Sequence, residues 1–508
     1  MPLSDSPTPL PRPLLDDSTL LIGGAWSAPE GSGRREIVNP FDASVIATVA
    51  EASAADADRA VRAARSAFEE GSWSRAPRTH RAEVLTGLAD SLQEHREEFA
   101  RLETLDTGKT LAESRFDVDD TTAVLRYYAA LSTTDAGRTV DTGRPGAQSR
   151  VVHEPVGVCA LITPWNYPLL QISWKLAPAL AAGNTVVAKP SELTPLTTIR
   201  LFELLHEQLE KAGAPGGTAN LVLGGGAVGA ALAGHPEVDL VSFTGGGVSG
   251  RAVMRAAADT VKKVALELGG KNPNIVFGDA DLDTAVDFAL TAAFLHSGQV
   301  CSAGSRLLLH RGLHAEFTAE LARRAELIRL GDGFAKGTES GPLISAEHRE
   351  KVERHVAGAL AEGAVLRAGG TRPTEPELQA GFFLRPTVLD GCRADMAVVR
   401  EEVFGPVLTI ELFDDEDEAV ALANDTPYGL AGAVWTRDTA RGERVAARLR
   451  LGTVWINDYH PYVPQAEWGG FKQSGTGREL GPSGLREYQE TKHVWRTLDP
   501  VPQRWFAG

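Results

Sequence analysis

Hydrophobic residues recur along the chain in two patterns. In the first part, Ala, Leu, Glu and Arg recur at helical spacing, which predicts helices over Ala54–Glu70, Arg81–Leu105 and Asp119–Thr133. From Pro155 onward, short β-branched runs such as VGVCALI and VDLVSF are separated by helical segments. Strands that alternate with helices indicate βαβ units and a parallel sheet. The pattern therefore predicts an α/β fold.

A second series of strands and helices begins near Lys271. Its strand runs are PNIVFG, SRLLLH, VLTIELF, GAVWT and GTVWIN, and its helical segments include Leu282–His296, Leu313–Ile328 and Ala346–Glu362. The glycine pair before Lys271 is the best domain boundary. The segment Thr134–Arg150 is rich in Thr, Gly and Arg, which predicts an exposed hairpin or arm.

Length and charge exclude several classes of protein. The 508 residues suffice for about three domains. The net charge is 51 − 67 = −16, which argues against a nucleic-acid partner because phosphate binding needs a basic surface. No run of about 18 apolar residues predicts a membrane span. Met1–Asp17 is proline-rich and unlike a secretory signal, so it predicts a disordered tail on a cytoplasmic protein.

Three cysteines are present, Cys159, Cys301 and Cys392. Their odd number and wide spacing predict neither a disulfide framework nor a zinc site, and no metal site is expected. Cys159 lies inside VGVCALI, which is typical of a buried, inert thiol. Cys301 follows Leu282–His296 at a turn of small residues, and this position predicts an accessible, reactive thiol.

A glycine pattern follows the run VDLVSFT. Gly245, Gly247 and Gly250 give G-x-G-x-x-G after a strand and before a helix, a pattern that indicates dinucleotide binding or simply a tight turn. The acidic residue that would hold the ribose, about 20 positions on, is Glu267. However, Glu267 lies between two leucines, where burial would raise its pKa and suit it as a general base. From the residues alone, Glu267 fits both the ribose-binding role and the role of general base.

Seven separated motifs then occur in the order of a known family. They are TPWNYP, KPSE, FTGGGVSG, LELGGK, GQVCSAGSR, EEVFGPV and WGGFKQSGTGRELG, within about Leu20 to Val494. In this combination the chain resembles the NAD(P)-dependent aldehyde dehydrogenase superfamily. The resemblance implies a Rossmann-like cofactor domain (1–132 and 153–268), an α/β catalytic domain (269–470) and a small β oligomerisation arm (133–152 and 471–508). It also implies a homodimer or homotetramer.

The same resemblance implies a reaction. Cys301 would add to the aldehyde as a thiohemiacetal and, after hydride transfer to NAD, would carry a thioester. Asn166 and the backbone N–H of Cys301 would stabilise the oxyanion. Glu267 would activate the hydrolytic water, which displaces its ribose interpretation. Lys175 and Glu479 match residues that are proposed to relay protons.

NAD is the cofactor that the resemblance implies. Lys189 and Glu192 match residues that hold the adenosine ribose, and a glutamate there repels a 2′-phosphate, which favours NAD over NADP. The family's phosphate segment usually has Ser and Thr where this chain has Gly246 and Gly247, so hydroxyl contacts to the pyrophosphate are lost. Further matching cofactor positions are Thr163, Pro164, Trp165, Gly245, Gly246, Gly250, Glu402 and Phe404.

Aromatic residues indicate the class of aldehyde. Tyr167, Trp174 and Trp468 match aromatics of the betaine aldehyde and aminoaldehyde dehydrogenases, and aromatic faces attract quaternary ammonium groups. Asp458 or Glu467 would add a negative potential that favours a cation. The prediction is oxidation of betaine aldehyde to glycine betaine. The alternatives are ω-aminoaldehydes such as 4-aminobutyraldehyde, or general aliphatic aldehydes for which the aromatics only line an apolar tunnel.

The site residues disfavour two other classes of protein. A non-catalytic NAD-binding structural protein is disfavoured because Cys301, Glu267 and Asn166 are all present. A CoA-acylating dehydrogenase is disfavoured because such enzymes usually lack the base at Glu267.

Overall fold

A mostly parallel sheet of eight strands is built largely from residues 20–268. The computed structural model describes residues 19–31 and 33–506, so the predicted tail Met1–Asp17 lies outside the described residues. The strand order is β19-β11-β10-β7-β8-β9-β1-β2. β1 (Leu20–Ile22), β2 (Ala25–Ser27) and β19 (Gly475–Thr476) pair antiparallel at the edges. The parallel strands are β7 (Val158–Ile162), β8 (Thr185–Lys189), β9 (Ala219–Leu221), β10 (Leu240–Gly245) and β11 (Lys263–Leu268).

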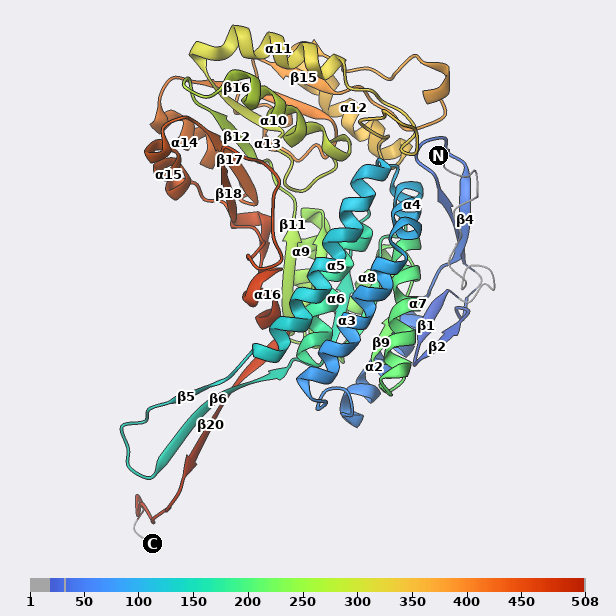
Figure 1. Ribbon diagram of the computed structural model, residues 1–508, viewed down its shortest axis with the longest axis vertical. Coiled ribbons are helices and arrows are strands. Elements are labelled where there is room, and N and C mark those ends of the chain that lie inside the picture. Colours follow the sequence, from blue (N-terminus) through green and yellow to red (C-terminus); the bar gives the residue numbers. More distant parts are fainter. Residues whose placement is uncertain (1–18, 32, 507–508) are drawn as a thin grey trace.

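The predicted helix Arg81–Leu105 is wrong, because the segment forms two helices. α3 (Arg78–Glu94) ends at His95, whose ring Nδ1 lies 2.8 Å from the Ser91 carbonyl, and α4 (Arg96–Thr107) follows at once. The next helix also starts earlier than predicted, and α3, α5 and α6 run side by side (Figure 1). Helices around this sheet are α2 (Ala54–Glu70), α5 (Leu111–Thr134), α6 (Pro168–Ala182), α7 (Leu196–Lys211), α8 (Gly226–Gly234) and α9 (Gly247–Ala258).

A second sheet forms the upper part of the molecule in Figure 1. Its order is β14-β15-β16-β13-β12-β17-β18, and all neighbours are parallel except β14 and β15. The strands are β12 (Pro273–Val276), β13 (Arg306–His310), β14 (Val365–Ala368), β15 (Thr387–Asp390), β16 (Val407–Phe413), β17 (Ala431–Trp435) and β18 (Thr453–Ile456). The helices that follow β11 in sequence are α10 (Leu282–Phe294), α11 (His314–Glu326), α12 (Ala346–Ala361), α13 (Ala397–Arg400), α14 (Glu416–Asn424), α15 (Thr439–Arg448) and α16 (Gly481–Glu487).

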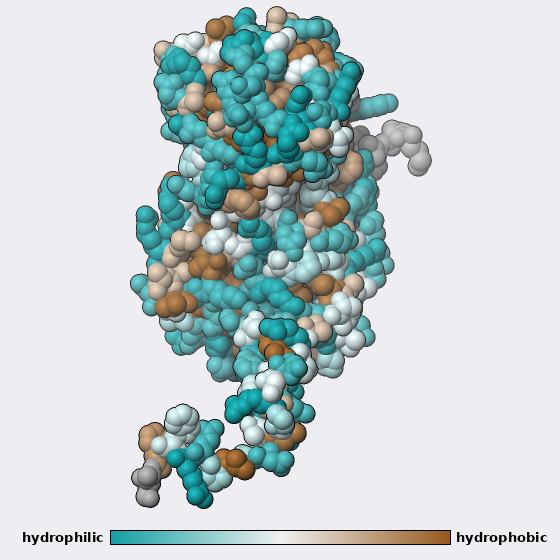
Figure 2. Space-filling view, turned by 90° about the vertical axis from the view of Figure 1, so that its left-hand side faces the viewer, coloured by the Kyte–Doolittle hydropathy of each residue, from teal (hydrophilic) through white to brown (hydrophobic). Residues whose placement is uncertain are grey.

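A narrow arm of three strands projects from the body (Figures 1 and 2). β6 (Ala147–Pro155) pairs antiparallel with β5 (Arg138–Val140) and, along its whole length, with β20 (Gln489–Thr497). Trp495 and Leu498 are exposed at the end of this arm. β3 (Arg34–Val38) and β4 (Val45–Ala50) form a separate two-stranded sheet. No helix among residues 19–31 and 33–506 is long and apolar enough to cross a membrane.

The parallel strands place several predicted site residues at one edge of the first sheet. Register pairs Ile162 with Lys189, and Thr244 with Glu267, at the carboxyl ends of four strands. The segment after β7 and the glycine turn after β10 leave the sheet at the same edge. In open α/β sheets this edge is where ligands bind.

A buried ion pair joins two neighbouring strands of the second sheet. Arg306 in β13 donates two hydrogen bonds to Glu411 in β16, at 2.6 and 2.9 Å. The side chains are only 1% and 4% exposed. An exposed pair of the same geometry, Arg311 with Asp414, lies just beyond the ends of these strands, with side chains 55% and 61% exposed.

Glu411→Ala is expected to destabilise the protein by about 3–5 kcal/mol, because it leaves a buried guanidinium without its counter-charge. The matched variant Asp414→Ala should cost less than about 1 kcal/mol, since water screens an exposed pair. Thermal unfolding midpoints of both variants test this. Equal unfolding midpoints for the two variants would show that burial does not decide how strongly each ion pair contributes to stability.

Candidate active site

Cys301 follows a turn with unusual backbone geometry. The sequence predicts a helix through His296, but α10 ends at Phe294. His296, Ser297 and Gly298 are all left-handed, with φ of 46°, 53° and 70°. Non-glycine residues adopt this conformation only where their surroundings impose it. The turn carries Cys301 to the wall of a cavity, where its side chain is half-buried.

Two asparagines hold this part of the chain. Asn272 donates through Nδ2 to the carbonyls of Cys301 and Ala303, at 2.9 and 3.0 Å. Asn166 donates through Nδ2 to the carbonyl of Gln299 at 2.8 Å. The sequence analysis identified Asn166 but missed Asn272. The only local signal for Asn272 is its place directly after the Gly-Gly-Lys that follows β11.

The predicted reacting groups meet in one cavity of about 220 Å³. Cys301, Asn166 and Glu267 all line it, although they come from three different elements. The remaining lining residues include the predicted Pro164, Trp165, Gly245, Gly246, Glu402 and Phe404, and also Gln171, Thr244, Leu268, Gly269, His348 and Lys351.

Glu267 is a buried carboxyl near the end of β11. Burial raises its pKa well above the usual range, and the nearby negative charge of Glu479 raises it further. The positive charge of Lys175 and a hydrogen bond from the Trp468 indole act in the opposite direction. That bond runs from Nε1 to Oε1 of Glu267 at 3.0 Å. A raised pKa makes the carboxyl a better proton acceptor than an exposed glutamate.

Lys175 and Glu479 form a buried ion pair beside Glu267. The Lys175 ammonium also donates to the hydroxyl of Thr244 at 2.7 Å. The second carboxylate oxygen of Glu479 is buried without a hydrogen-bond partner. Backbone hydrogen bonds of 2.7 and 2.8 Å join Glu479 to Trp468. Glu479 is therefore held beside the residue that contacts Glu267.

The surroundings of Cys301 oppose ionisation of its thiol. Burial raises its pKa, and the negative charges of Glu267 and Glu402 raise it further. A thiol in this environment needs a base to become a nucleophile. Glu267 is a carboxyl of raised pKa on the wall of the same cavity.

A larger cavity of about 460 Å³ shares residues with the first. The predicted cofactor residues Thr163, Pro164, Trp165, Lys189, Glu192, Gly245 and Gly246 line it. Gly246 is the N-cap of α9, so the positive end of the helix faces this cavity. A Cβ on Gly246 would find no atom within 4 Å, whereas a Cβ on Gly250 would come within 2.6 Å of Leu268. Gly246 thus leaves open space at the N-terminus of α9, and Gly250 lets α9 pack closely on Leu268 of β11.

Lys189 points its ammonium at backbone carbonyls. Its Nζ donates to Pro190 at 2.8 Å and to Gly224 at 2.6 Å, and lies 3.8 Å from a Glu192 oxygen. Burial lowers the pKa of Lys189. Lys189 and Glu192 thus present one positive and one negative group to the same wall of the cavity.

Glu402 and Phe404 line the smaller cavity together with Cys301. Burial raises the pKa of Glu402 to about 7. A Cβ at Gly269 would approach a Glu402 oxygen to 1.9 Å, so the Glu402 carboxyl lies directly against this glycine. Phe404 has a positive φ of 60°, and its ring meets the Trp165 ring edge-on at 5.3 Å.

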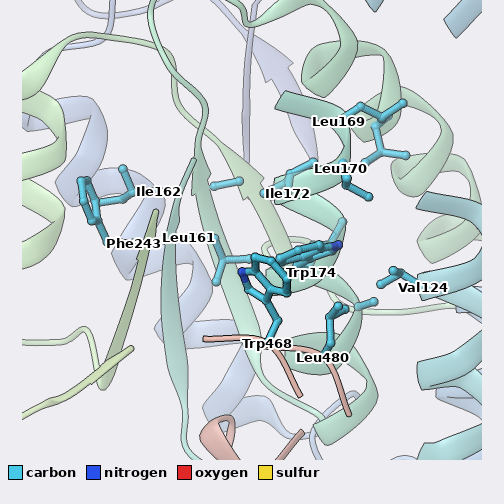
Figure 3. Packing of buried hydrophobic residues seen from close by; sticks show 14 of the residues in the cluster. Val124, Leu161, Ile162, Leu169, Leu170, Ile172, Trp174, Phe243, Trp468 and Leu480 are labelled. Atoms are coloured by element: carbon cyan, nitrogen blue, oxygen red, sulfur yellow. The ribbon is translucent and has the colours of Figure 1, made fainter. Parts of the chain in front are cut away.

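Trp174 and Trp468 lie side by side although they are far apart in the sequence (Figure 3). Their ring centroids are 6.0 Å apart, and Tyr462 lies 5.4 Å from Trp174 and 6.3 Å from Trp468. These three residues are the aromatic cluster. Sequence analysis missed Tyr462, which follows the strand β18 in a loop whose path it could not predict. Trp468 belongs to the cluster and also donates to Glu267.

Tyr167, the third predicted cage residue, packs edge-on against His296 at 5.4 Å. Its ring also faces the buried ammonium of Lys109, 4.1 Å from the ring centroid. It thus borders the turn that precedes Cys301.

The acids predicted to favour a cation are both exposed. Asp458 accepts from its neighbour's backbone N–H, and Glu467 accepts from the Ser483 hydroxyl at 2.9 Å. A different acid reaches the aromatic cluster, because the Tyr462 hydroxyl donates to Asp120 of α5 at 2.5 Å. Burial raises the pKa of Asp120.

Comparison with known proteins agrees with this geometry. The chain is 58% identical, over 489 residues, to betaine aldehyde dehydrogenase of Bacillus subtilis (strain 168), covering 96% of this chain and 99% of that protein. It is 42% identical to a peroxisomal aminoaldehyde dehydrogenase of Pisum sativum, covering 96% and 97%. The crystal structure of Staphylococcus aureus betaine aldehyde dehydrogenase in complex with NAD+ superposes with a TM-score of 0.95 at 52% identity, covering 97% of each chain. Residues 26–494 match the model of the aldehyde dehydrogenase family, and the chain belongs to this family.

Proposed function

We propose that the protein oxidises betaine aldehyde to glycine betaine with NAD as hydride acceptor. The observation that carries this proposal is the double contact of Trp468, which packs in the aromatic cluster and donates to the carboxyl of Glu267. A binding surface for a cation and a candidate base therefore share one residue. The 58% identity to a bacterial betaine aldehyde dehydrogenase supports the same substrate.

The larger cavity fits a dinucleotide. Its volume of about 460 Å³, the open space over Gly246 and the N-terminus of α9 suit a pyrophosphate, and Lys189 and Glu192 suit a ribose. Glu402 and Phe404 would hold the nicotinamide end beside Cys301. NAD supplies the hydride acceptor when it is bound. The structure of an NAD+ complex at 52% identity supports this cofactor.

Cys301 is the proposed nucleophile. The thiol loses its proton to a base and its sulfur bonds to the aldehyde carbon, while the carbonyl electrons move to oxygen. Asn166 gives one amide hydrogen to Gln299, which fixes the plane of the amide, and its other hydrogen is the proposed oxyanion donor. Each such donor contributes about 3 kcal/mol to the transition state.

Glu267 is the proposed base for thioester hydrolysis. It takes one proton from water, the hydroxide adds to the thioester carbon, and the C–S bond breaks to release the carboxylate and restore the thiol. Lys175 and Glu479 tune this carboxyl through their opposite charges and are the proposed proton relay.

The aromatic cluster is the proposed site for the trimethylammonium group. Each ring face attracts a cation by about 0.5–2 kcal/mol. A second candidate substrate is an ω-aminoaldehyde, because relatives at 42% identity are named aminoaldehyde dehydrogenases and Asp120 lies against Tyr462.

The projecting arm is the proposed oligomerisation element of a homodimer or homotetramer. A narrow three-stranded arm needs an apolar face packed against a partner to be stable, and its exposed Trp495 and Leu498 gain from burial against another copy. We place the enzyme in the cytoplasm, in the formation of glycine betaine.

Initial rates of NADH formation with betaine aldehyde, 4-aminobutyraldehyde and hexanal test the substrate. The kcat/KM for betaine aldehyde should exceed that for hexanal by about tenfold or more, which is 1.4 kcal/mol of transition-state preference. Cys301→Ala should abolish turnover. Preference for hexanal, or an active Cys301→Ala enzyme, would contradict the substrate or the nucleophile, respectively.

Trp174→Leu provides the matched control, because leucine keeps an apolar wall and removes the ring. Only the kcat/KM for the cationic aldehyde should then fall. An equal fall for hexanal would mean that the aromatic cluster acts by shape alone.

The pH profile of kcat tests the charges around Glu267. Activity needs its carboxylate form, so kcat rises with pH through its pKa. Lys175→Met removes a charge that lowers this pKa and should move the rising limb to higher pH. Glu479→Gln removes a charge that raises it and should move the limb to lower pH. Shifts in the same direction would exclude this tuning.

Glu192→Ser tests the preference for NAD. Removing the carboxylate from the proposed ribose site removes its repulsion of a 2′-phosphate, so the ratio of kcat/KM with NADP to that with NAD should rise about tenfold. The NAD reaction of the same variant is the internal control. An unchanged ratio would show that Glu192 does not discriminate between the ribose of NAD and the 2′-phosphorylated ribose of NADP.

A further inference from the structure

The turn before Cys301 is anchored by a carboxylate from a distant helix. Glu113 lies in the first turn of α5, and its Oε1 accepts a hydrogen bond from the backbone N–H of His296 at 2.8 Å. Its Oε2 accepts from the backbone N–H and the hydroxyl of Thr110, at 2.8 and 2.7 Å. One oxygen thus caps α5 while the other holds the turn, 183 positions away in the sequence.

His296 is the residue at which this turn has to be held. It is the first of the three left-handed residues, and its carbonyl accepts from the backbone N–H and the side-chain Nε2 of Gln299, at 3.1 and 3.2 Å. Gln299 in turn receives the hydrogen bond from Asn166. His296 is therefore connected to Cys301 along the chain, and to Asn166 through the hydrogen bonds of Gln299.

Other contacts hold the later residues of the turn. The Ser297 hydroxyl donates to the carbonyl of Gly341 at 2.5 Å, and Oε1 of Gln299 accepts from Ile344 at 2.9 Å. The contact from Glu113 differs because its acceptor is a carboxylate, and hydrogen bonds to ionised groups are roughly twice as strong as neutral ones. It also ties the turn to α5 rather than to the loop at Gly341–Ile344.

We propose that Glu113 is a positioning residue for the nucleophile: it fixes the left-handed turn at His296 and thereby sets the placement of Cys301 and Asn166. This inference rests on the proposed role of Cys301. Glu113 is not among the residues that line the cavity, so it acts only through the backbone of the turn.

Glu113→Gln tests the proposal with little change of shape. Glutamine has one acceptor oxygen, so it cannot accept from both Thr110 and His296. We expect kcat to fall about ten- to a hundredfold, because a shift of about 1 Å in a reacting group has effects of this size, with KM changed less than kcat. We also expect a change in the rate at which iodoacetamide alkylates Cys301. Mass spectrometry of the peptide that contains Cys301 measures this rate over a pH series.

Asp56→Asn is the matched control for loss of a helix cap. Asp56 occupies the same position of a capping box in α2, where one oxygen accepts from Ser53 and the other from the backbone of Glu30. This variant should lower the unfolding midpoint and leave kcat and the alkylation profile unchanged. If Asp56→Asn lowers kcat as much as Glu113→Gln does, stability alone explains the loss and the proposal falls.

Glu113→Asp separates the cap from the anchor. Aspartate caps a helix from this position, as Asp56 does, but its side chain is one methylene shorter than that of Glu113, which draws its second oxygen away from His296. Both Glu113 variants should therefore have a lower kcat than the wild-type protein. A kcat within twofold of wild type in either variant overturns the positioning role. Alkylation of Cys301 needs no aldehyde, so these results stay separate from Cys301→Ala, which tests the proposed function itself.

Discussion

Desolvation of charge is the constraint on which this site depends. Glu267, Glu479 and Lys175 are all buried where the first sheet meets the segment that follows β18. Burial raises the pKa of the Glu267 carboxyl, and the positive charge of the buried Lys175 acts in the opposite direction. Buried charges of this kind persist only when each has partners, and the indole of Trp468 and the hydroxyl of Thr244 supply two of these.

The sequence predicted the residues that line the cavity better than the residues that hold them in place. Cys301, Glu267 and Asn166 were identified because their motifs are local and specific. Their meeting in one cavity was an implication of the family resemblance. The strands were predicted well because β-branched runs bounded by glycine report burial directly.

Elements that depend on tertiary contacts escaped sequence analysis. The break at His95 has neither proline nor glycine beside it, so helical spacing continues through it. Tyr462 and Asn272 act through partners that are far away in the chain, and no local pattern marks them. The fully extended pairing of β20 with β6 is likewise set by contact between distant segments.

The position of Trp468 and Glu479 late in the sequence has a consequence for synthesis. A growing chain that has emerged only as far as β18 holds Cys301 and Glu267 but lacks Trp468, Glu479 and the edge strand β19. Domains fold largely as they emerge from the ribosome. Glu267 therefore stays without Trp468 and Glu479 until the last part of the chain has docked, so the proposed site is completed late in folding.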